Sequence, residues 1–135
     1  MKEKVMIFGV FDGLHDGHRF FIKEAQKYAK QLYIVITTDQ MVMRMKDHRP
    51  KYTLFERVQM LEKEFPRVNI VVGDKHLREW RVLKENNPDI IALGYDQNKL
   101  FNPLSQVQEE YNFELIQIKE SYKGDKLHSS LIHKK

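Results

Sequence analysis

Short, continuous apolar runs alternate along this chain with segments in which apolar residues recur every three or four positions. The runs are bounded by turn or polar residues and predict buried strands at residues 5–10, 32–37, 68–72, 90–93 and 113–118. The spaced segments predict amphipathic helices, because this spacing gathers apolar side chains on one helix face. We expect these helices at residues 18–32, 39–45, 53–65, 77–84 and 103–111. Two helix starts have capping signals, Asp39 for one and a capping box of Thr53 and Glu56 for the other.

Strands that alternate with helices, and that are apolar throughout, are typical of a parallel sheet covered on both faces. The sequence therefore predicts an α/β fold: one doubly wound domain over residues 1–135, with about five parallel strands and Rossmann-like topology. In such folds ligands bind beyond the carboxyl ends of the strands. This rule singles out residues 11–18, 37–51, 73–76 and 94–100.

Composition narrows the class of ligand. The 135 residues contain no cysteine, so any metal would be bound by His, Asp or Glu, and a reducing, cytoplasmic setting is expected. No apolar run is long enough to predict a membrane span. The net charge of +4 is modest, and it favours small molecules that carry phosphate over nucleic acid or a membrane surface.

The predicted turn after the first strand carries the clearest chemistry. His15 and His18 are three residues apart where strand becomes helix, so their side chains share a face next to free backbone N–H groups and the positive end of the helix dipole. Gly17 lets a phosphate approach the backbone closely. The glycines of this turn do not form a GxGxxG fingerprint, and no Walker lysine follows. The alternative is two surface histidines that only cap a helix.

The string formed by Gly9, Phe11, Asp12, His15, Gly17 and His18 resembles the signature of the cytidylyltransferase-like nucleotidyltransferases. The resemblance implies that a substrate phosphate attacks the α-phosphorus of a nucleoside triphosphate and that pyrophosphate leaves. It implies three catalytic residues, His15, His18 and Lys46. The implied nucleotide-binding residues are Val10, Phe11, Asp12, Gly17, Gly94, Tyr95, Asp96, Lys126, Ser129 and Ser130. The implied substrate-binding residues are Asp12, Thr38, Asp39, Arg49 and Arg57, the last of which could instead be a structural ion-pair partner.

Residues 89–97 are similar to the same region of archaeal-type FAD synthases, which implies an FMN adenylyltransferase that uses ATP. Near the end of the chain, Ser129 and Ser130 match the family's hydroxyl pair, whereas Lys123 and Lys126 stand where the family has an arginine. Two alternatives remain open: a CTP-dependent cytidylyltransferase acting on glycerol 3-phosphate or a related acceptor, and a non-catalytic relative that only binds nucleotide.

Cofactor and assembly follow from the same resemblance. Mg²⁺ is expected to bind through the triphosphate, so no protein ligand is assigned to it. Family members are often dimers, and the short helix after the second strand offers apolar residues for such an interface: Met41, Val42, Met43 and Met45. These four side chains could equally belong to the core.

Overall fold

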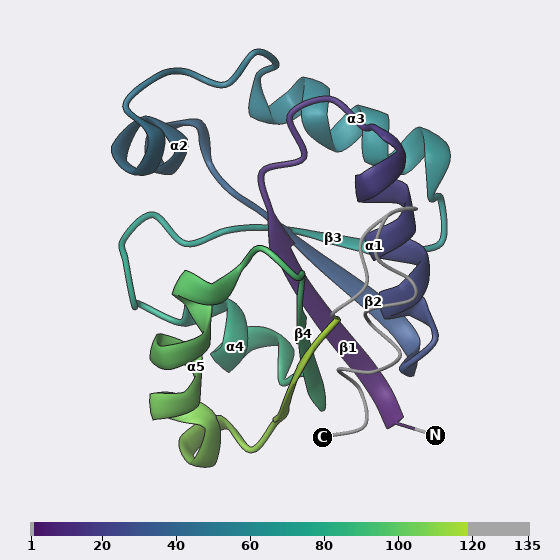
Figure 1. Ribbon diagram of the computed structural model, residues 1–135, viewed down its shortest axis with the longest axis vertical. Coiled ribbons are helices and arrows are strands. Elements are labelled where there is room, and N and C mark those ends of the chain that lie inside the picture. Colours follow the sequence, from purple (N-terminus) through teal and green to yellow (C-terminus); the bar gives the residue numbers. More distant parts are fainter. Residues whose placement is uncertain (1, 119–135) are drawn as a thin grey trace.

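The computed structural model describes residues 2–118, and its centre is a five-stranded sheet in the order β3-β2-β1-β4-β5 (Figure 1). Every strand pair is parallel. The strands are β1 (Lys2–Gly9), β2 (Ala29–Ile36), β3 (Asn69–Val72), β4 (Ile90–Leu93) and β5 (Glu114–Gln117). The helices are α1 (Asp16–Gln26), α2 (Asp39–Lys46), α3 (Leu54–Glu64), α4 (Arg81–Asn86) and α5 (Asn98–Tyr111). The predicted doubly wound α/β fold is confirmed.

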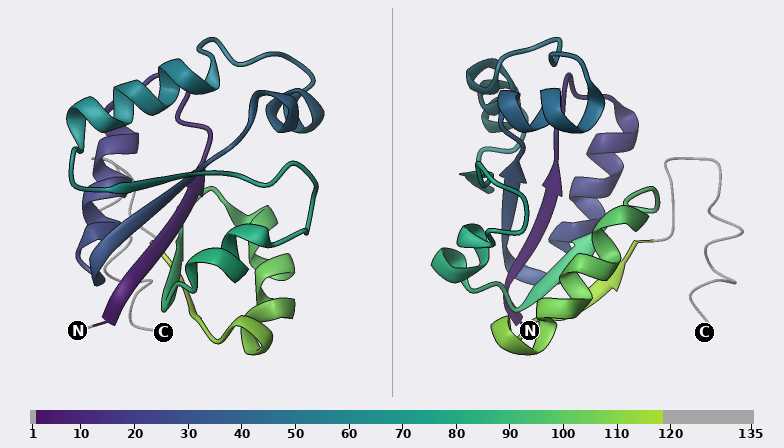
Figure 2. Two further views of the ribbon diagram at one scale, coloured as in Figure 1. Left: turned by 180° about the vertical axis from the view of Figure 1, so that it is seen from behind. Right: turned by 90° about the vertical axis from the view of Figure 1, so that its left-hand side faces the viewer.

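Helices cover both faces of the sheet, as the two views of Figure 2 show. One core layer joins α1 and α3 to side chains of the central strands such as Val5, Ile34 and Ala92. The other joins α4 and α5 to the opposite side chains of the same strands, such as Met6 and Ile91. Burial on both faces explains why these strands are apolar throughout. Strand order reverses between β1 and β4, which is where this fold class binds ligands.

The first helix is shorter than its apolar stripe predicted. α1 ends at Gln26, and the last apolar residues of the stripe, Ala29 and Leu32, belong to β2 and are buried there. Both residues pack in the same core layer as α1, so the spacing reflected a shared layer and not a single helix. Tertiary packing overrides the helical pattern here.

Three other boundaries also differ from the sequence prediction. Thr38, not Asp39, caps α2, since its hydroxyl accepts a hydrogen bond from the Met41 N–H at 3.1 Å. α4 begins only at Arg81, and Leu77 lies exposed in the loop before it. α5 begins at Asn98 and contains Pro103, although proline removes one backbone donor inside a helix. By contrast, the capping box of Thr53 and Glu56 is confirmed at the start of α3.

The apolar residues of α2 divide between core and surface. Met41 and Val42 are buried, whereas Met43 is 42% exposed and Met45 is 58% exposed. Half of the group is therefore core, and a dimer interface through this helix would rest on Met43 and Met45 alone. None of the described helices is both long and apolar enough to cross a membrane.

Candidate active site

The turn from β1 into α1 has a tightly specified backbone. β1 ends at Gly9, whose carbonyl accepts the backbone N–H and the hydroxyl of Thr37 at 3.0 and 3.2 Å. Phe11 then adopts a left-handed conformation, with φ +52°, and its carbonyl accepts the Gly13 N–H at 3.0 Å. A non-glycine residue with positive φ is uncommon and costs energy, so the surrounding contacts must hold it in place.

Gly9 is required because the Phe11 ring folds back over it. A Cβ on Gly9 would lie 2.6 Å from the ring, which is itself buried. The edge of the same ring packs against His18, with 5.3 Å between the ring centroids. Gly9 therefore makes room for a ring that supports one of the two histidines.

Replacing Gly9 by alanine is expected to destabilise the protein by about 1 to 3 kcal/mol, the usual cost of overpacking a core site. Urea unfolding measures this loss. In a double-mutant cycle with Phe11→Leu, much of the loss should disappear, because the smaller side chain vacates the position that the new methyl group would enter. Equal losses in both backgrounds would refute the packing explanation.

His15 and His18 form a reciprocal pair at the start of α1. His15 is the N-cap, and its Nδ1 accepts the N–H groups of Gly17 and His18 at 3.1 and 3.3 Å. The Nδ1 of His18 in turn accepts the His15 N–H at 3.3 Å. The two rings stack with their centroids 3.7 Å apart. Because each Nδ1 accepts a hydrogen bond, the Nε2 of each ring carries a proton and can donate it to a ligand.

Gly17 has a second function in this arrangement. A Cβ at Gly17 would lie 3.0 Å from the His15 ring. The glycine therefore gives the stacked rings their space, in addition to the close approach of a phosphate expected from the sequence. The capping interpretation and the ligand interpretation of the two histidines are compatible, because capping occupies Nδ1 and leaves Nε2 as the donor.

His18 is kept uncharged by its surroundings. Partial burial lowers its pKa, and the neighbouring His15 lowers it further, to about 4; the Gly13 backbone and Asp96 oppose the shift. At neutral pH this ring is consequently a neutral hydrogen-bond donor, and it is neither a cation nor a proton-transfer acid.

This shift predicts a pH dependence of folding stability. The unfolded chain protonates His18 near its ordinary pKa of 6.5, whereas the folded chain resists protonation down to about 4. Above about pH 6.5 His18 is neutral in both states and the protein has its full free energy of unfolding. As the pH falls towards 4, protonation of His18 in the unfolded chain lowers that free energy. Urea unfolding at pH 7 and pH 4.5 should show that the His18→Asn variant loses less stability on acidification than the wild type. An identical loss in both proteins would contradict the shift.

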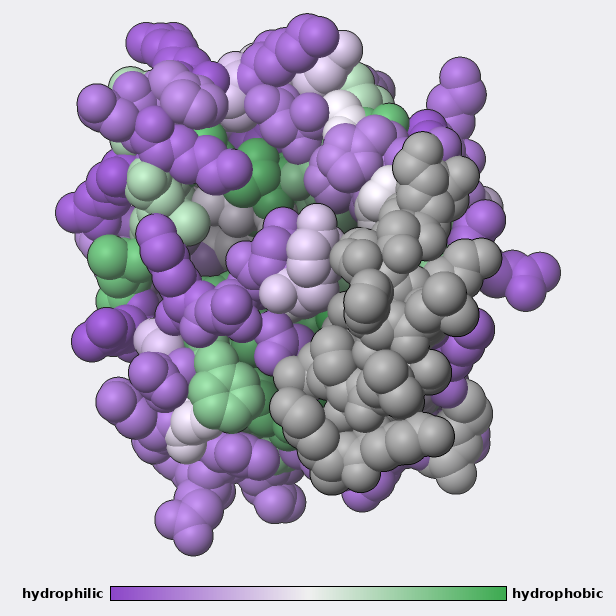
Figure 3. All heavy atoms as spheres, in the orientation of Figure 1, coloured by the Kyte–Doolittle hydropathy of each residue, from purple (hydrophilic) through white to green (hydrophobic). Residues whose placement is uncertain are grey.

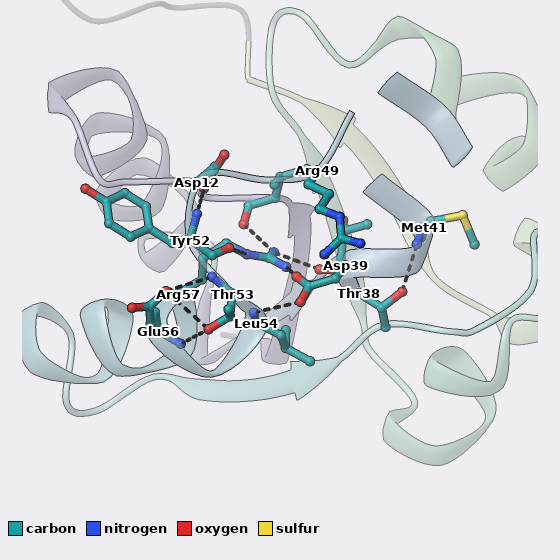
Figure 4. A network of polar contacts seen from close by, with 12 residues as sticks. Asp12, Thr38, Asp39, Met41, Arg49, Tyr52, Thr53, Leu54, Glu56 and Arg57 are labelled. Atoms are coloured by element: carbon teal, nitrogen blue, oxygen red, sulfur yellow. Dashed lines mark hydrogen bonds and ion pairs between the residues drawn. The ribbon is translucent and has the colours of Figure 1, made fainter. Parts of the chain in front are cut away.

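Asp12 connects the turn to the loop before α3. Its carboxylate accepts the backbone N–H groups of Lys51 and Tyr52 at 2.7 and 2.8 Å (Figure 4). Burial alone would raise the pKa of Asp12, but these two N–H groups and the charges of Arg57 and Lys51 outweigh it and hold the pKa below its usual value. The geometry gives Asp12 the role of fixing residues 51–52 beside the turn.

Arg57 lies at the centre of the network in Figure 4 and is completely buried. Its Nη1 donates to the carbonyls of Val10 and Thr37 at 3.0 and 2.7 Å, which joins the chain just after β1 to the chain just after β2. Its Nε donates to the Tyr52 carbonyl at 3.1 Å, and its Nη2 pairs with Asp39. The structure thus favours the structural interpretation of Arg57, and of Asp39 as its partner.

The turn after β4 is joined to β1 by Gln97, the last residue of the segment 89–97 that resembles FAD synthases. Gln97 accepts the Gly94 N–H through Oε1 and donates to the Phe8 carbonyl through Nε2, both at 2.8 Å. Gln117 of β5 donates to the Gly94 carbonyl at 3.2 Å. These amides hold the turn across the β1–β4 switch point. Tyr95 is 54% exposed beside it, and the charge of Asp96 acts on His18. No role was predicted for Gln97, although its place after a predicted strand lies in one of the segments expected to bind ligands.

The remaining candidate residues are distributed around the same edge of the sheet. Thr38 caps α2, Lys46 ends that helix, and Arg49 follows in an exposed loop and is labelled in Figure 4. Lys126, Ser129 and Ser130 lie outside the described residues. Within residues 2–118, no group of three His, Asp or Glu side chains gathers as a metal site.

Comparison with known proteins identifies the family. The family model described as cytidylyltransferase-like matches residues 6–135. A protein of Thermococcus sibiricus named FAD synthase is 35% identical over 99% of this chain and 92% of its own length. A second FAD synthase, from Aciduliprofundum boonei, is 40% identical over 70% of this chain and 62% of its own length.

Solved structures agree with the fold. A crystal structure described as a lipopolysaccharide core biosynthesis protein of Thermoplasma volcanium superposes with a TM-score of 0.77 and 28% identity, over 90% of this chain and 98% of that one. Part of a bifunctional NMN adenylyltransferase/ADP ribose pyrophosphatase from Francisella tularensis superposes with a TM-score of 0.64 at 20% identity, a likeness of fold, over 92% of this chain and 39% of that one. By its sequence match, its parallel sheet and its paired histidines, this chain belongs to the cytidylyltransferase-like family.

Proposed function

We propose that this protein is an FMN adenylyltransferase, which makes FAD from FMN and ATP and releases pyrophosphate. The paired Nε2 donors of His15 and His18 at the carboxyl edge of the sheet are the observation that carries the reaction class. The choice of substrates is supported by the relatives named FAD synthase, one of which matches nearly the whole chain.

In this reaction an oxygen of the FMN phosphate attacks the α-phosphorus of ATP. A new P–O bond forms, the bond from the α-phosphorus to the bridging oxygen breaks, and pyrophosphate takes the electron pair. The FMN phosphate is already ionised near neutral pH, so the reaction needs no protein nucleophile and no general base. Holding the two phosphates in line can contribute about 7 to 11 kcal/mol to the lowering of the barrier.

The two histidines supply Nε2–H donors for the charge that develops on the phosphate oxygens. Both protons are positioned in advance, because backbone N–H groups occupy each Nδ1. One well-aimed donor of this kind contributes about 2.7 to 4 kcal/mol. Lys46 and Arg49 are proposed to add positive charge from the segment after α2, and Gly94, Tyr95 and Asp96 to line the nucleotide side. Lys126, Ser129 and Ser130 are proposed for the triphosphate from the family resemblance alone.

Mg²⁺ fits this site as an ion carried by the substrate. Each oxygen of Asp12 accepts a backbone hydrogen bond, so this carboxylate already has a structural role at the turn. An ion bound through the β- and γ-phosphates needs few protein ligands, and when bound it would neutralise charge on the leaving group.

A matrix of ATP or CTP against FMN or glycerol 3-phosphate tests the proposal, with pyrophosphate release and FAD absorbance as readouts. We expect pyrophosphate and FAD only from ATP with FMN. Turnover of CTP with glycerol 3-phosphate would replace this proposal by the cytidylyltransferase alternative. If none of the four substrate pairs releases pyrophosphate although the protein still binds nucleotide, the protein would be the non-catalytic relative.

Self-association is a separate proposal with its own measurement. The exposed Met43 and Met45 of α2 would lie in the interface of a homodimer. Sedimentation should then show a dimer that Met43→Lys and Met45→Lys dissociate. A wild-type monomer at high concentration would reject the dimer.

A further inference from the structure

A polar depression lies on the carboxyl side of the sheet, between α2 and the loop from β3 to α4. Its volume is about 260 Å³, and it is lined by Gln40, Arg44, Lys75 and His76. Gln40 and Arg44 are four residues apart and share one face of α2, while Lys75 and His76 face them from the loop. Figure 3 shows a recess near the centre of this face, with both hydrophilic and hydrophobic side chains around it.

The lining is rich in donors and contains no carboxylate. All four side chains can donate hydrogen bonds, and neither Arg44 nor Lys75 forms an ion pair within the described part of the chain. The acidic neighbours in sequence are engaged elsewhere. Asp39, next to Gln40, pairs with Arg57 and accepts the Leu54 N–H. Asp74, next to Lys75, accepts the N–H groups of Arg81 and Val82 at 3.1 and 3.2 Å. The positive charge of the depression is therefore left for a ligand.

The loop that carries Lys75 and His76 is held in a defined shape. Trp80 occupies the N-cap position of α4, but its side chain forms no capping hydrogen bond. The carboxylate of Asp74 accepts the first N–H groups of the helix instead. Arg78 and Trp80 both adopt positive φ values, +60° and +57°, and Trp80 packs against the core layer beneath α4 and α5. Such conformations persist only where neighbouring contacts determine them, and they often occur at ligand sites.

We propose that this depression binds a phosphate group, at a subsite separate from the histidine pair. An arginine fork, an ammonium, an imidazole and an amide together suit the oxygens of a phosphate. The volume is below the ~300 to 1,000 Å³ of pockets that enclose a whole small ligand, so it fits one charged group of a larger substrate. Its walls follow β2 and β3, whereas the Gly94–Gln97 turn follows β4 on the other side of β1. The subsite thus lies across the histidine turn from the proposed nucleotide side.

Two substrates of the proposed reaction could supply that phosphate. The choice between them rests on the proposed function. One source is the end of the ATP triphosphate, which becomes pyrophosphate. The other is the phosphate of the acceptor, FMN. The shared chemistry is a phosphate group, and riboflavin, which lacks it, separates the second source from contacts made by the flavin ring.

The test is calorimetric titration of the full chain with inorganic pyrophosphate, FMN and riboflavin at fixed ionic strength. The variants are Arg44→Gln, Lys75→Gln and the double variant. Arg67→Gln and Lys63→Gln are matched controls, because they remove the same charges from exposed positions before the amino end of β3, whereas the depression follows the carboxyl ends of β2 and β3. Circular dichroism checks that each variant folds, and KM for ATP and for FMN is measured in parallel.

We expect the double variant to bind the phosphate ligand roughly tenfold more weakly, which is the combined effect of two exposed charged contacts, while the control pair changes binding less than twofold. Weaker pyrophosphate binding with a raised KM for ATP assigns the subsite to the triphosphate. Weaker FMN binding with unchanged riboflavin binding assigns it to the acceptor. Equal losses in the control pair, or unchanged binding of both ligands in the double variant, would overturn the subsite. Pyrophosphate binding that depends on Arg44 and Lys75, in a protein that makes no FAD, would uphold the subsite and reject the proposed function.

Discussion

Replacement of Arg57 by methionine is expected to lower the free energy of unfolding by about 3 to 5 kcal/mol. The guanidinium is wholly buried and donates to the carbonyls of Val10, Thr37 and Tyr52 as well as to Asp39. Methionine fills a similar volume but satisfies none of these acceptors, and a buried polar group without a partner carries its full desolvation cost. Urea unfolding at pH 7 measures the loss.

Matched variants separate burial from charge in this experiment. Arg57→Lys retains the charge but cannot reach four acceptors with one ammonium, so an intermediate loss is expected. Asp39→Asn should cost less, because that carboxyl group is 45% exposed and water can replace the ion pair. A loss below about 1 kcal/mol for Arg57→Met would mean that the network relaxes and that Arg57 is not its organising group.

Replacement of His18 by asparagine is expected to reduce turnover about 10²-fold or more with little change in stability. The Asn Oδ1 can take the place of Nδ1 and accept the His15 N–H, so the N-terminal capping is retained. What disappears is the Nε2 donor, the atom proposed to contact the phosphate in the transition state. Steady-state kinetics of FAD formation, with urea unfolding alongside, provides both readouts.

A second substitution serves as the control for His18. Glutamine can place an amide N–H near the former Nε2 position but does not provide the Nδ1 acceptor, so His18→Gln should recover part of the turnover while losing some stability. The opposite result, normal turnover in His18→Asn together with a large stability loss, would make His18 a capping residue alone. A higher kcat for His18→Gln than for His18→Asn indicates that His18 donates to the phosphate, and the reverse order indicates that it only caps the helix.

The boundaries of the elements show where local patterns fail. The apolar stripe that predicted one helix to Leu32 is divided between α1 and β2, because both pack in the same layer and side-chain spacing does not distinguish them. The cap of α2 was assigned to Asp39, a good capping residue, but the buried guanidinium of Arg57 takes that carboxylate and Thr38 caps instead. In both cases a contact distant in sequence decides the outcome.

In the candidate site, too, local sequence predicted some features and distant contacts decided others. The histidine turn could be located from its spacing after an apolar strand, but the occupation of both Nδ1 atoms depends on backbone geometry at the start of α1. Asp12 and Arg57 were associated with substrate, whereas the structure directs their polar atoms to the backbone of residues 10, 37, 51 and 52. No local signal in the sequence reports such a partner, because the donor and acceptor are up to 47 residues apart.

The sequence by itself determined the class of fold, the order of strands and helices along the chain, and the place of the histidine pair, since these depend on local periodicity and on residues close together in the chain. Only the tertiary structure decided the sheet order, the burial of Arg57, the fixing of the 51–52 loop by Asp12, and the meeting of α2 with the β3–α4 loop around Arg44 and Lys75. Those features depend on which strand ends become neighbours. Paired strands come from distant parts of the chain, and no local sequence pattern indicates which strands will pair. The side chains at their ends therefore meet only once the sheet has assembled.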